Sequence, residues 1–251
     1  TGASEGGIIT TQLIEQNSTL FTAGLAACGP IGNFPFQINY FGDARVIFEV
    51  FFPGLIPGEL FNPPQDIVDD WANYYDTVVK PEVFKPANRG KLNQWVAVAK
   101  LPFDAADYLN TVEISVKDVL RYNVVNSVDA AATLGGFPYD NSTRYYTGSA
   151  NDVLLNLLAQ RFSADPVAVQ EMQDNYRTTG QLDIPLVTIH TTKDQQVPYL
   201  HQQLYTLKTL ASGDLGINHI PIPVDRFEHC NFELSEILTA LILTLQLGGG
   251  I

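Results

Sequence analysis

The chain has 251 residues, 45% of them hydrophobic, so it is long enough to bury a substantial core. Its formal net charge of −13 would repel a phosphate backbone, and we therefore expect no nucleic-acid partner. No membrane span is expected either, because the longest apolar run, at about 234–247, is broken by Ser235, Glu236 and Thr239.

The first residues contain Gly2-Ala3-Ser4-Glu5-Gly6, which has the pattern Gly-x-Ser-x-Gly. This pattern is typical of a nucleophile elbow, a sharp turn between a strand and a helix that exposes a serine hydroxyl. Residues 8–16 follow with apolar side chains near helical spacing, which predicts that helix. We expect Gly2 and Gly6 to allow close backbone approach, and the backbone N–H of Glu5 to face a developing oxyanion.

An apolar run at 20–28 predicts the next strand, and the chain then changes character as far as Asp183. Loops rich in Pro, Gly and Asn separate a series of helix-like segments in this stretch. We expect helices at about 40–52, 64–79, 92–99, 115–125, 150–161 and 165–178. We interpret residues 31–182 as a helical cap or lid, with its many aromatic side chains mainly in the core of the cap.

Two further strands are predicted at 184–191 and 218–224. Asp194 follows the first of them, and His229 follows the second, in a loop before a helix at about 232–247. A serine needs a base to take its proton, and the base needs an acid that fixes its tautomer. Ser4, Asp194 and His229 are therefore the candidate catalytic residues.

The remaining histidines lack such a setting. His190 lies in or at the end of a strand, His201 lies on a helix predicted at 198–211, and His219 begins a strand, so we interpret all three as structural or surface groups. No spacing of His, Cys and Asp indicates a zinc site, and no glycine-rich phosphate loop is present. We expect neither a metal ion nor a cofactor.

The segments Gly2–Gly7 and Pro185–Pro198, together with His229, resemble in their order the C-terminal part of an α/β-hydrolase, from the nucleophile elbow onward. The resemblance implies an α/β fold whose sheet is formed by residues 1–30 and 183–251, with the helical cap inserted between them. One departure is Thr191, which stands where the family often has glycine. Another is the loop that supplies the second oxyanion amide, which this sequence lacks.

The resemblance also implies a serine esterase that cleaves small carboxylic esters through an acyl-enzyme on Ser4, with His229 as base and Asp194 orienting it. A serine peptidase of the prolyl-oligopeptidase type shares the order of the triad and is the alternative. A non-catalytic binding fragment is the second alternative. An N-terminal nucleophile hydrolase using Thr1 is disfavoured, because a helical pattern comes first and neither acid nor histidine would have a role.

The predicted sheet lacks the strands that precede the elbow in this family. Without them the strand at 20–28 would expose an apolar edge, which promotes association. We therefore expect an N-terminal companion fragment, or a segment outside this sequence, to complete the sheet.

Cys28 and Cys230 are the two cysteines, and both are expected near the carboxyl edge of the sheet. A disulfide there would brace the histidine loop. We favour two buried thiols, because strand positions alone do not show that the Cα atoms come within bridging distance. Tannase-like and feruloyl esterases also have a cysteine after the catalytic histidine, but its partner precedes the serine, where this chain has Ala3.

Charged residues make up 16% of the chain, against about 25% in an average globular protein. Uncharged polar residues replace them, which favours an extracellular or periplasmic location. Asn17 and Asn141 each begin a glycosylation sequon, which has meaning only in a eukaryotic secretory route.

Overall fold

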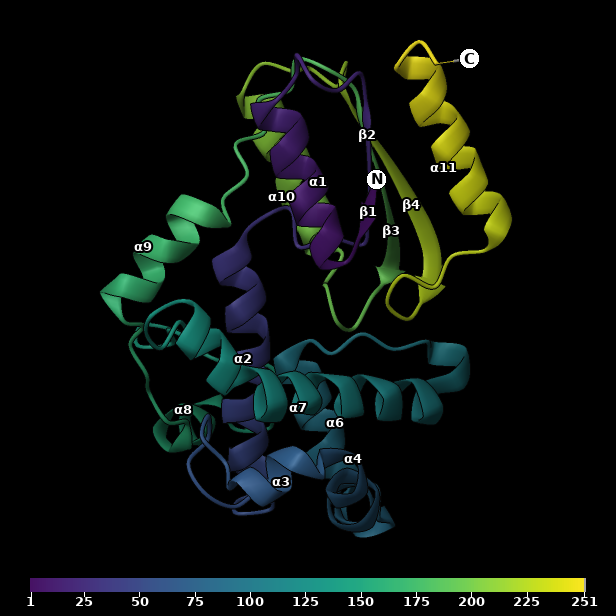
Figure 1. The fold of residues 1–251 in the computed structure, drawn as a ribbon. Helices are drawn as coiled ribbons and strands as arrows, with labels where there is room; N and C mark the ends of the chain where they lie inside the picture. Colours follow the sequence, from purple (N-terminus) through teal and green to yellow (C-terminus); the bar gives the residue numbers. More distant parts are fainter. Residues whose placement is uncertain (251) are drawn as a thin grey trace. The chain divides into compact units, whose positions relative to one another are not determined.

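The computed structural model describes residues 1–250, and the chain divides into two compact units. One unit contains the two ends of the chain, Thr1–Gln37 and Gln173–Ile251, and the other contains the stretch between them, Ile38–Met172. Figure 1 shows a sheet with flanking helices in the first unit and a group of helices in the second. No helix among the described residues is long and apolar enough to cross a membrane.

The first unit is built on a parallel sheet, which confirms the prediction of an α/β fold. Its strands are β1 (Gly2–Ala3), β2 (Gly24–Ala27), β3 (Leu186–Lys193) and β4 (His219–Phe227). They lie in the order β1-β2-β3-β4, and each neighbouring pair is parallel (Figure 1). Because the strands run the same way, the loops that follow them meet at one edge of the sheet.

Helices cover both faces of this sheet. Helices α1 (Glu5–Gln16) and α10 (Leu200–Ala211) lie on one face, and α11 (Leu234–Leu247) lies on the other (Figure 1). The side chains of the strands alternate accordingly: Ala26 packs with the first group, whereas Leu25 and Ala27 pack with the second. The apolar strands predicted from the sequence are therefore buried from two sides, as is usual for parallel sheets.

The N-terminal strands differ from the prediction. β2 begins at Gly24 rather than at residue 20, because residues 18–20 form a turn after α1. β1 was not predicted, and it pairs Gly2 with Ala26 and Ala3 with Ala27. The expectation that the strand at 20–28 would be an open edge is wrong, since β2 lies between β1 and β3.

The outer strand β4 carries two prolines, Pro221 and Pro223, and both are exposed. Proline has no N–H to donate to a further strand, so within sheets it is confined to edges and bulges. The sequence of β4 thus suits its position at an edge of the sheet.

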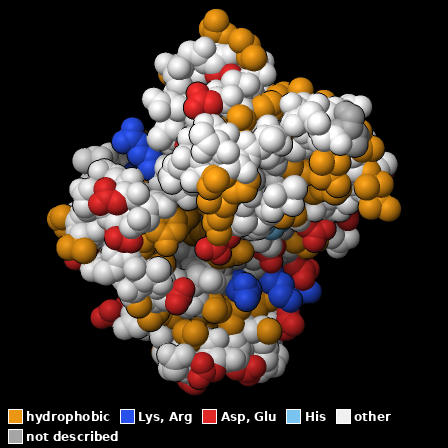
Figure 2. Space-filling model, turned by 45° about the horizontal axis from the view of Figure 1, so that its top comes forward, with side chains coloured by type: hydrophobic (Ala, Val, Ile, Leu, Met, Phe, Trp, Pro, Cys, Tyr) orange, Lys and Arg blue, Asp and Glu red, His pale blue; other side chains and the backbone are white. Residues whose placement is uncertain are grey.

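The helix α11 also exposes apolar side chains at helical spacing, namely Leu234, Leu238, Ile242 and Leu245. Its opposite face packs on the sheet through Ala240, which is fully buried. Apolar side chains are common on the molecular surface, as Figure 2 shows for one face. The long apolar run at the C-terminus is therefore only partly explained by the core of the first unit.

The stretch between β2 and β3 is helical. Its helices are α2 (Phe34–Phe51), α3 (Gln65–Asp69), α4 (Trp71–Tyr74), a π-helical turn (Tyr75–Val79), α5 (Lys80–Val83), α6 (Arg89–Ala99), α7 (Tyr108–Thr133), α8 (Asp152–Leu158) and α9 (Pro166–Asn175), with 3-10 turns at Pro86–Asn88 and Ala105–Asp107. The segment predicted at 64–79 is divided among α3, α4 and the π-helical turn. Helix α7 is longer than predicted, because no Gly or Pro interrupts residues 108–133.

The core of the helical unit is aromatic, as the sequence suggested. Phe48, Tyr75 and Trp95 are fully buried, and the Trp95 ring N–H donates to the Ala44 carbonyl at 2.9 Å. The rings of Phe48 and Trp95 meet edge to face with centroids 4.8 Å apart. These side chains are explained by packing within the unit.

A polar cluster around the buried Tyr139 and Tyr146 fixes the loop at 134–148. The Asp43 carboxylate accepts hydrogen bonds from the hydroxyls of Tyr139 and Tyr146, each at 2.8 Å, and pairs with Arg144. Burial raises the pKa of Asp43 above its ordinary value, although Arg144 opposes the shift. Asn141 is buried, and its side-chain amide donates to the Gln160 carbonyl at 2.9 Å. The nitrogen that a glycan would modify is therefore inaccessible in the folded chain.

Candidate active site

Ser4 lies in the turn between β1 and α1, as the elbow pattern predicts. Its φ is 55° and its ψ is −123°, a conformation that is unusual for a residue other than glycine. The Ser4 N–H donates to the Ala27 carbonyl at 2.9 Å, and the Gly7 N–H donates to the Ser4 carbonyl at 2.8 Å. These two hydrogen bonds hold a turn whose backbone strain costs on the order of 1–3 kcal/mol.

The glycines around Ser4 have only in part the roles expected of them. A Cβ on Gly2 would collide with the Gly6 carbonyl, so Gly2 does allow close approach. A Cβ on Gly6 would meet nothing within 4 Å, so the expectation for Gly6 is wrong. The close contact instead involves Gly7, where a Cβ would lie 2.9 Å from the Gly29 Cα and 3.0 Å from the Ala27 carbonyl oxygen. Gly7 therefore lets α1 start directly against the chain that follows β2.

The structure brings Ser4, Asp194 and His229 together at the carboxyl edge of the sheet. The Ser4 Oγ lies 2.9 Å from the His229 Nε2, across 225 residues of sequence. The His229 Nδ1 lies 2.7 Å from the Asp194 Oδ2. With the Nδ1–H donating to the carboxylate, Nε2 carries the lone pair and accepts the Ser4 hydroxyl proton. All three side chains are thus positioned for proton transfer from serine to histidine.

Asp194 is fully buried at the end of β3, and each of its oxygens accepts hydrogen bonds. Its Oδ1 accepts from the backbone N–H groups of Gln196 at 2.9 Å and Val197 at 2.8 Å. Burial raises the pKa of Asp194, but hydrogen bonds from His190 and His229 outweigh it, and the pKa lies below its ordinary value. Asp194 is therefore a charged partner for the histidine.

His190 is a residue that the sequence interpretation placed among the structural or surface groups. It is buried on β3, where its Nε2–H donates to the Val197 carbonyl at 2.8 Å and lies 3.4 Å from the Asp194 Oδ2. Two histidine rings thus converge on one carboxylate. One sign of this contact was present in the sequence, since His190 and Asp194 are only four residues apart, across the end of a predicted strand.

The other two histidines are buried and neutral. The His201 Nδ1 accepts from the Asn33 N–H at 3.3 Å, and burial lowers the pKa of His201 to about 3. The His219 Nε2 lies 3.0 Å from the Thr188 hydroxyl, and burial lowers the pKa of His219 to about 4. Burial thus favours the uncharged form of both rings.

A disulfide joins Cys28 and Cys230, with Cα atoms 5.5 Å apart, so the preference for two buried thiols is wrong. Cys28 follows β2 and Cys230 follows β4, and the parallel sheet brings these two ends to one edge. Among the described residues, six other than glycine have positive φ, and four of these are Ser4, Cys28, Glu228 and Cys230. Backbone strain is therefore concentrated around the candidate site.

Glu5 is the first residue of α1 and is exposed. Its N–H belongs to the first turn of the helix, whose amides have no acceptor within the helix. The helix dipole also favours negative charge at this end. The position suits the oxyanion role predicted for the Glu5 N–H, which remains a prediction.

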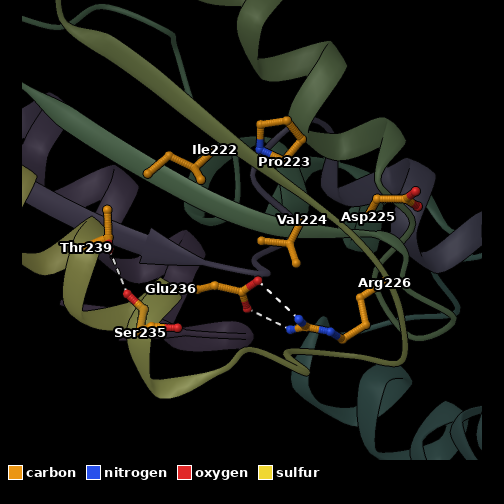
Figure 3. A pocket seen from close by; sticks show the side chains of 8 residues that line it. All are labelled: Ile222, Pro223, Val224, Asp225, Arg226, Ser235, Glu236 and Thr239. Atoms are coloured by element: carbon orange, nitrogen blue, oxygen red, sulfur yellow. Dashed lines mark hydrogen bonds and ion pairs between the residues drawn. The ribbon is translucent and has the colours of Figure 1, made fainter.

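A groove of about 380 Å³ lies elsewhere in the first unit, between β4 and α11 (Figure 3). It is lined by Ile222, Pro223, Val224, Asp225, Arg226, Ser235, Glu236 and Thr239. Arg226 pairs with Glu236 at 2.6 Å and with Glu233 at 3.0 Å, so its charge is already neutralised. None of the three candidate catalytic side chains lines this groove.

Fold and site together define an α/β protein with a Ser-His-Asp arrangement at the edge of a parallel sheet. No family model matches the chain, and no curated protein matches it. Among solved structures the chain is similar to MGS-M2, an α/β hydrolase enzyme from a Medee basin deep-sea metagenome library, at 13% identity and a TM-score of 0.38. The match covers 99% of this chain but 63% of that one, so the chain spans less than two thirds of its length. At this identity and TM-score the likeness establishes neither family nor function.

Proposed function

We propose that the chain is a serine hydrolase of the α/β-hydrolase type, which cleaves small carboxylic esters through an acyl-enzyme on Ser4. The observation that carries the proposal is the pair of hydrogen bonds at His229, with Nε2 2.9 Å from Ser4 and Nδ1 2.7 Å from Asp194. The strained turn at Ser4 and the chain order Ser, Asp, His support it.

In the acylation step the Ser4 oxygen attacks the ester carbonyl carbon while its proton passes to the His229 Nε2. Asp194 stabilises the imidazolium that forms, and the N-terminal amides of α1 stabilise the oxyanion. His229 then donates its proton to the leaving alcohol oxygen, and the acyl group remains on Ser4. Water hydrolyses the acyl-enzyme, with His229 first accepting the proton of the water and then returning it to the Ser4 oxygen.

We further propose that the helical unit Ile38–Met172 serves as the cap or lid of this hydrolase. The unit is inserted in the sequence between β2 and β3, and lids of this kind set substrate preference in many enzymes. The disulfide supports an oxidising location, extracellular or periplasmic, since such bonds persist mainly outside the cytosol.

A fluorophosphonate probe tests the proposal, because it reacts with serines that an adjacent base activates. We expect labelling of the native chain at Ser4, located by peptide mass spectrometry, and no labelling of Ser4→Ala. His229→Gln should label weakly. The control is Ser18→Ala, which removes a hydroxyl that donates a hydrogen bond to Asp183 in the same unit, and it should label as the native chain does. Folded native chain that stays unlabelled would overturn the proposal.

The substrate class is tested separately with p-nitrophenyl esters of short acids and with aminoacyl p-nitroanilides. We expect turnover of the esters and little turnover of the anilides. The opposite preference would replace the esterase proposal with a peptidase while leaving the roles of Ser4, Asp194 and His229 intact.

A further inference from the structure

Three atoms that could ligate a metal ion lie close together at the candidate active site. The sulfurs of Cys28 and Cys230 and a ring nitrogen of His229 all lie within 4.8 Å of one another. The Cys230 Sγ is 3.4 Å from the His229 Nε2. In the present oxidised form the two sulfurs are bonded to each other, so they do not act as ligands.

We propose that reduction of the Cys28–Cys230 disulfide creates a binding site for a Zn²⁺-like cation, with two thiolates and the His229 Nε2 as ligands. A cation bound there switches off the hydrolase, a consequence that rests on the function proposed above. The disulfide thus decides whether a cation can compete with the Ser4 proton for the His229 Nε2.

The spacing of the three atoms suits such a cation. Zn²⁺ binds thiolate at about 2.3 Å and imidazole at about 2.0 Å, usually in tetrahedral geometry, which places neighbouring ligand atoms roughly 3.5–3.8 Å apart. The contact between Cys230 and His229 is already close to this value. Once the bond between the sulfurs is broken, rotation of the two cysteine side chains separates them, and a cation bound to the His229 Nε2 replaces its hydrogen bond with Ser4.

The surroundings of His229 favour ligation by its Nε2. The Nδ1–H donates to Asp194, which leaves the lone pair on Nε2 and repeats the carboxylate–histidine–metal arrangement common in zinc proteins. Cys28 is fully buried, whereas the His229 side chain is partly exposed, so a cation can reach the site from the histidine side. The negative charge of the chain also attracts cations.

The redox step needs an external dithiol as reductant. The S–S bond breaks, the two sulfurs take up two electrons and two protons, and the dithiol is oxidised to its own disulfide. Binding of the cation then displaces the two thiol protons. Since the Nε2 lone pair is now held by the cation, it cannot accept the proton of Ser4, and acylation stops.

Cobalt(II) titration tests the site, because thiolate-to-cobalt charge transfer gives a near-ultraviolet absorption that does not depend on enzyme activity. We expect the dithiol-reduced chain, after removal of the dithiol under anaerobic conditions, to bind one equivalent of cobalt(II) and show the charge-transfer band. The oxidised chain and the double variant Cys28→Ser/Cys230→Ser should show none. Ser4→Ala should keep the band, so the site is tested even if Ser4 proves not to be a nucleophile.

A second measurement follows the switch itself. In the reduced chain, Zn²⁺ should abolish fluorophosphonate labelling of Ser4, and a chelator should restore it, whereas the oxidised chain should label at all times. The proposal is overturned if the reduced chain gives no cobalt band, or if the double serine variant gives the same band. Loss of the far-ultraviolet circular dichroism on reduction would also overturn it, because the site needs the folded sheet edge.

Discussion

Acidification from pH 7 to pH 5 should destabilise the sheet-containing unit through two buried histidines. Burial lowers the pKa of His201 to about 3 and that of His219 to about 4, against an ordinary value of about 6.5. The folded state therefore binds fewer protons than the unfolded state in this range. The stabilising contribution of each neutral ring is complete above pH 6.5 and is lost as the pH falls toward the folded pKa.

The size of the effect follows from the distance between pH 5 and the unfolded pKa. One pKa unit corresponds to 1.36 kcal/mol, so 1.5 units give about 2 kcal/mol for each histidine. Two histidines give about 4 kcal/mol, a large part of the 5–15 kcal/mol by which a typical domain is stable. In both cases burial is the cause, since it disfavours the charged form of the ring.

Urea denaturation at a series of pH values between 7.5 and 5, followed by circular dichroism, measures this dependence. We compare the native chain with His201→Gln, His219→Gln and the double variant, since glutamine keeps a polar side chain that does not titrate. Each single variant should lose about half of the pH-dependent change, and the double variant nearly all of it. Equal pH dependence in the native chain and the double variant would refute the reasoning.

Three other predictions concern single residues. Gly7→Ala should destabilise the chain by about 1–3 kcal/mol, because the added Cβ would press on the neighbouring backbone. Gly6→Ala, whose Cβ meets nothing, should be neutral or stabilising by up to about 1 kcal/mol. Equal effects of the two changes in urea denaturation would contradict this prediction. Asp194→Asn should lower kcat for a p-nitrophenyl ester by roughly 10³–10⁴-fold with little change in KM, and a loss below tenfold would exclude its orienting role. Asp43→Ala should cost about 1–3 kcal/mol of unfolding free energy, because it removes the acceptor of the buried Tyr139 and Tyr146 hydroxyls. The exposed Asp69→Ala should stay within about 0.5 kcal/mol, and similar midpoints for the two variants would argue against this role of Asp43.

The sequence was sufficient for the parts of the fold that give a periodic signal. The strands at 184–191 and 218–224 were recognisable as apolar runs, and Asp194 and His229 lie in the loops after them. β1 was missed because two residues carry no periodicity, and their pairing with β2 depends on tertiary contacts.

The finer features of the site depend on distances in space rather than on local pattern. Cys28 and Cys230 are separated by 202 residues, and only the parallel arrangement of the strands shows that they meet. The exchange of roles between Gly6 and Gly7 is likewise invisible in a motif, because it depends on where Gly29 lies. His190 contacts Asp194 only because β3 ends between them.

The prolines of β4 limit how copies of this sheet could join one another. In a fibril every copy pairs through two sheet edges, one with the copy before it and one with the copy after it. Pro221 and Pro223 remove two backbone donors from the β4 edge, which disfavours pairing of a further strand there. Two prolines in one outer strand thus act against edge-to-edge growth of the sheet on that side.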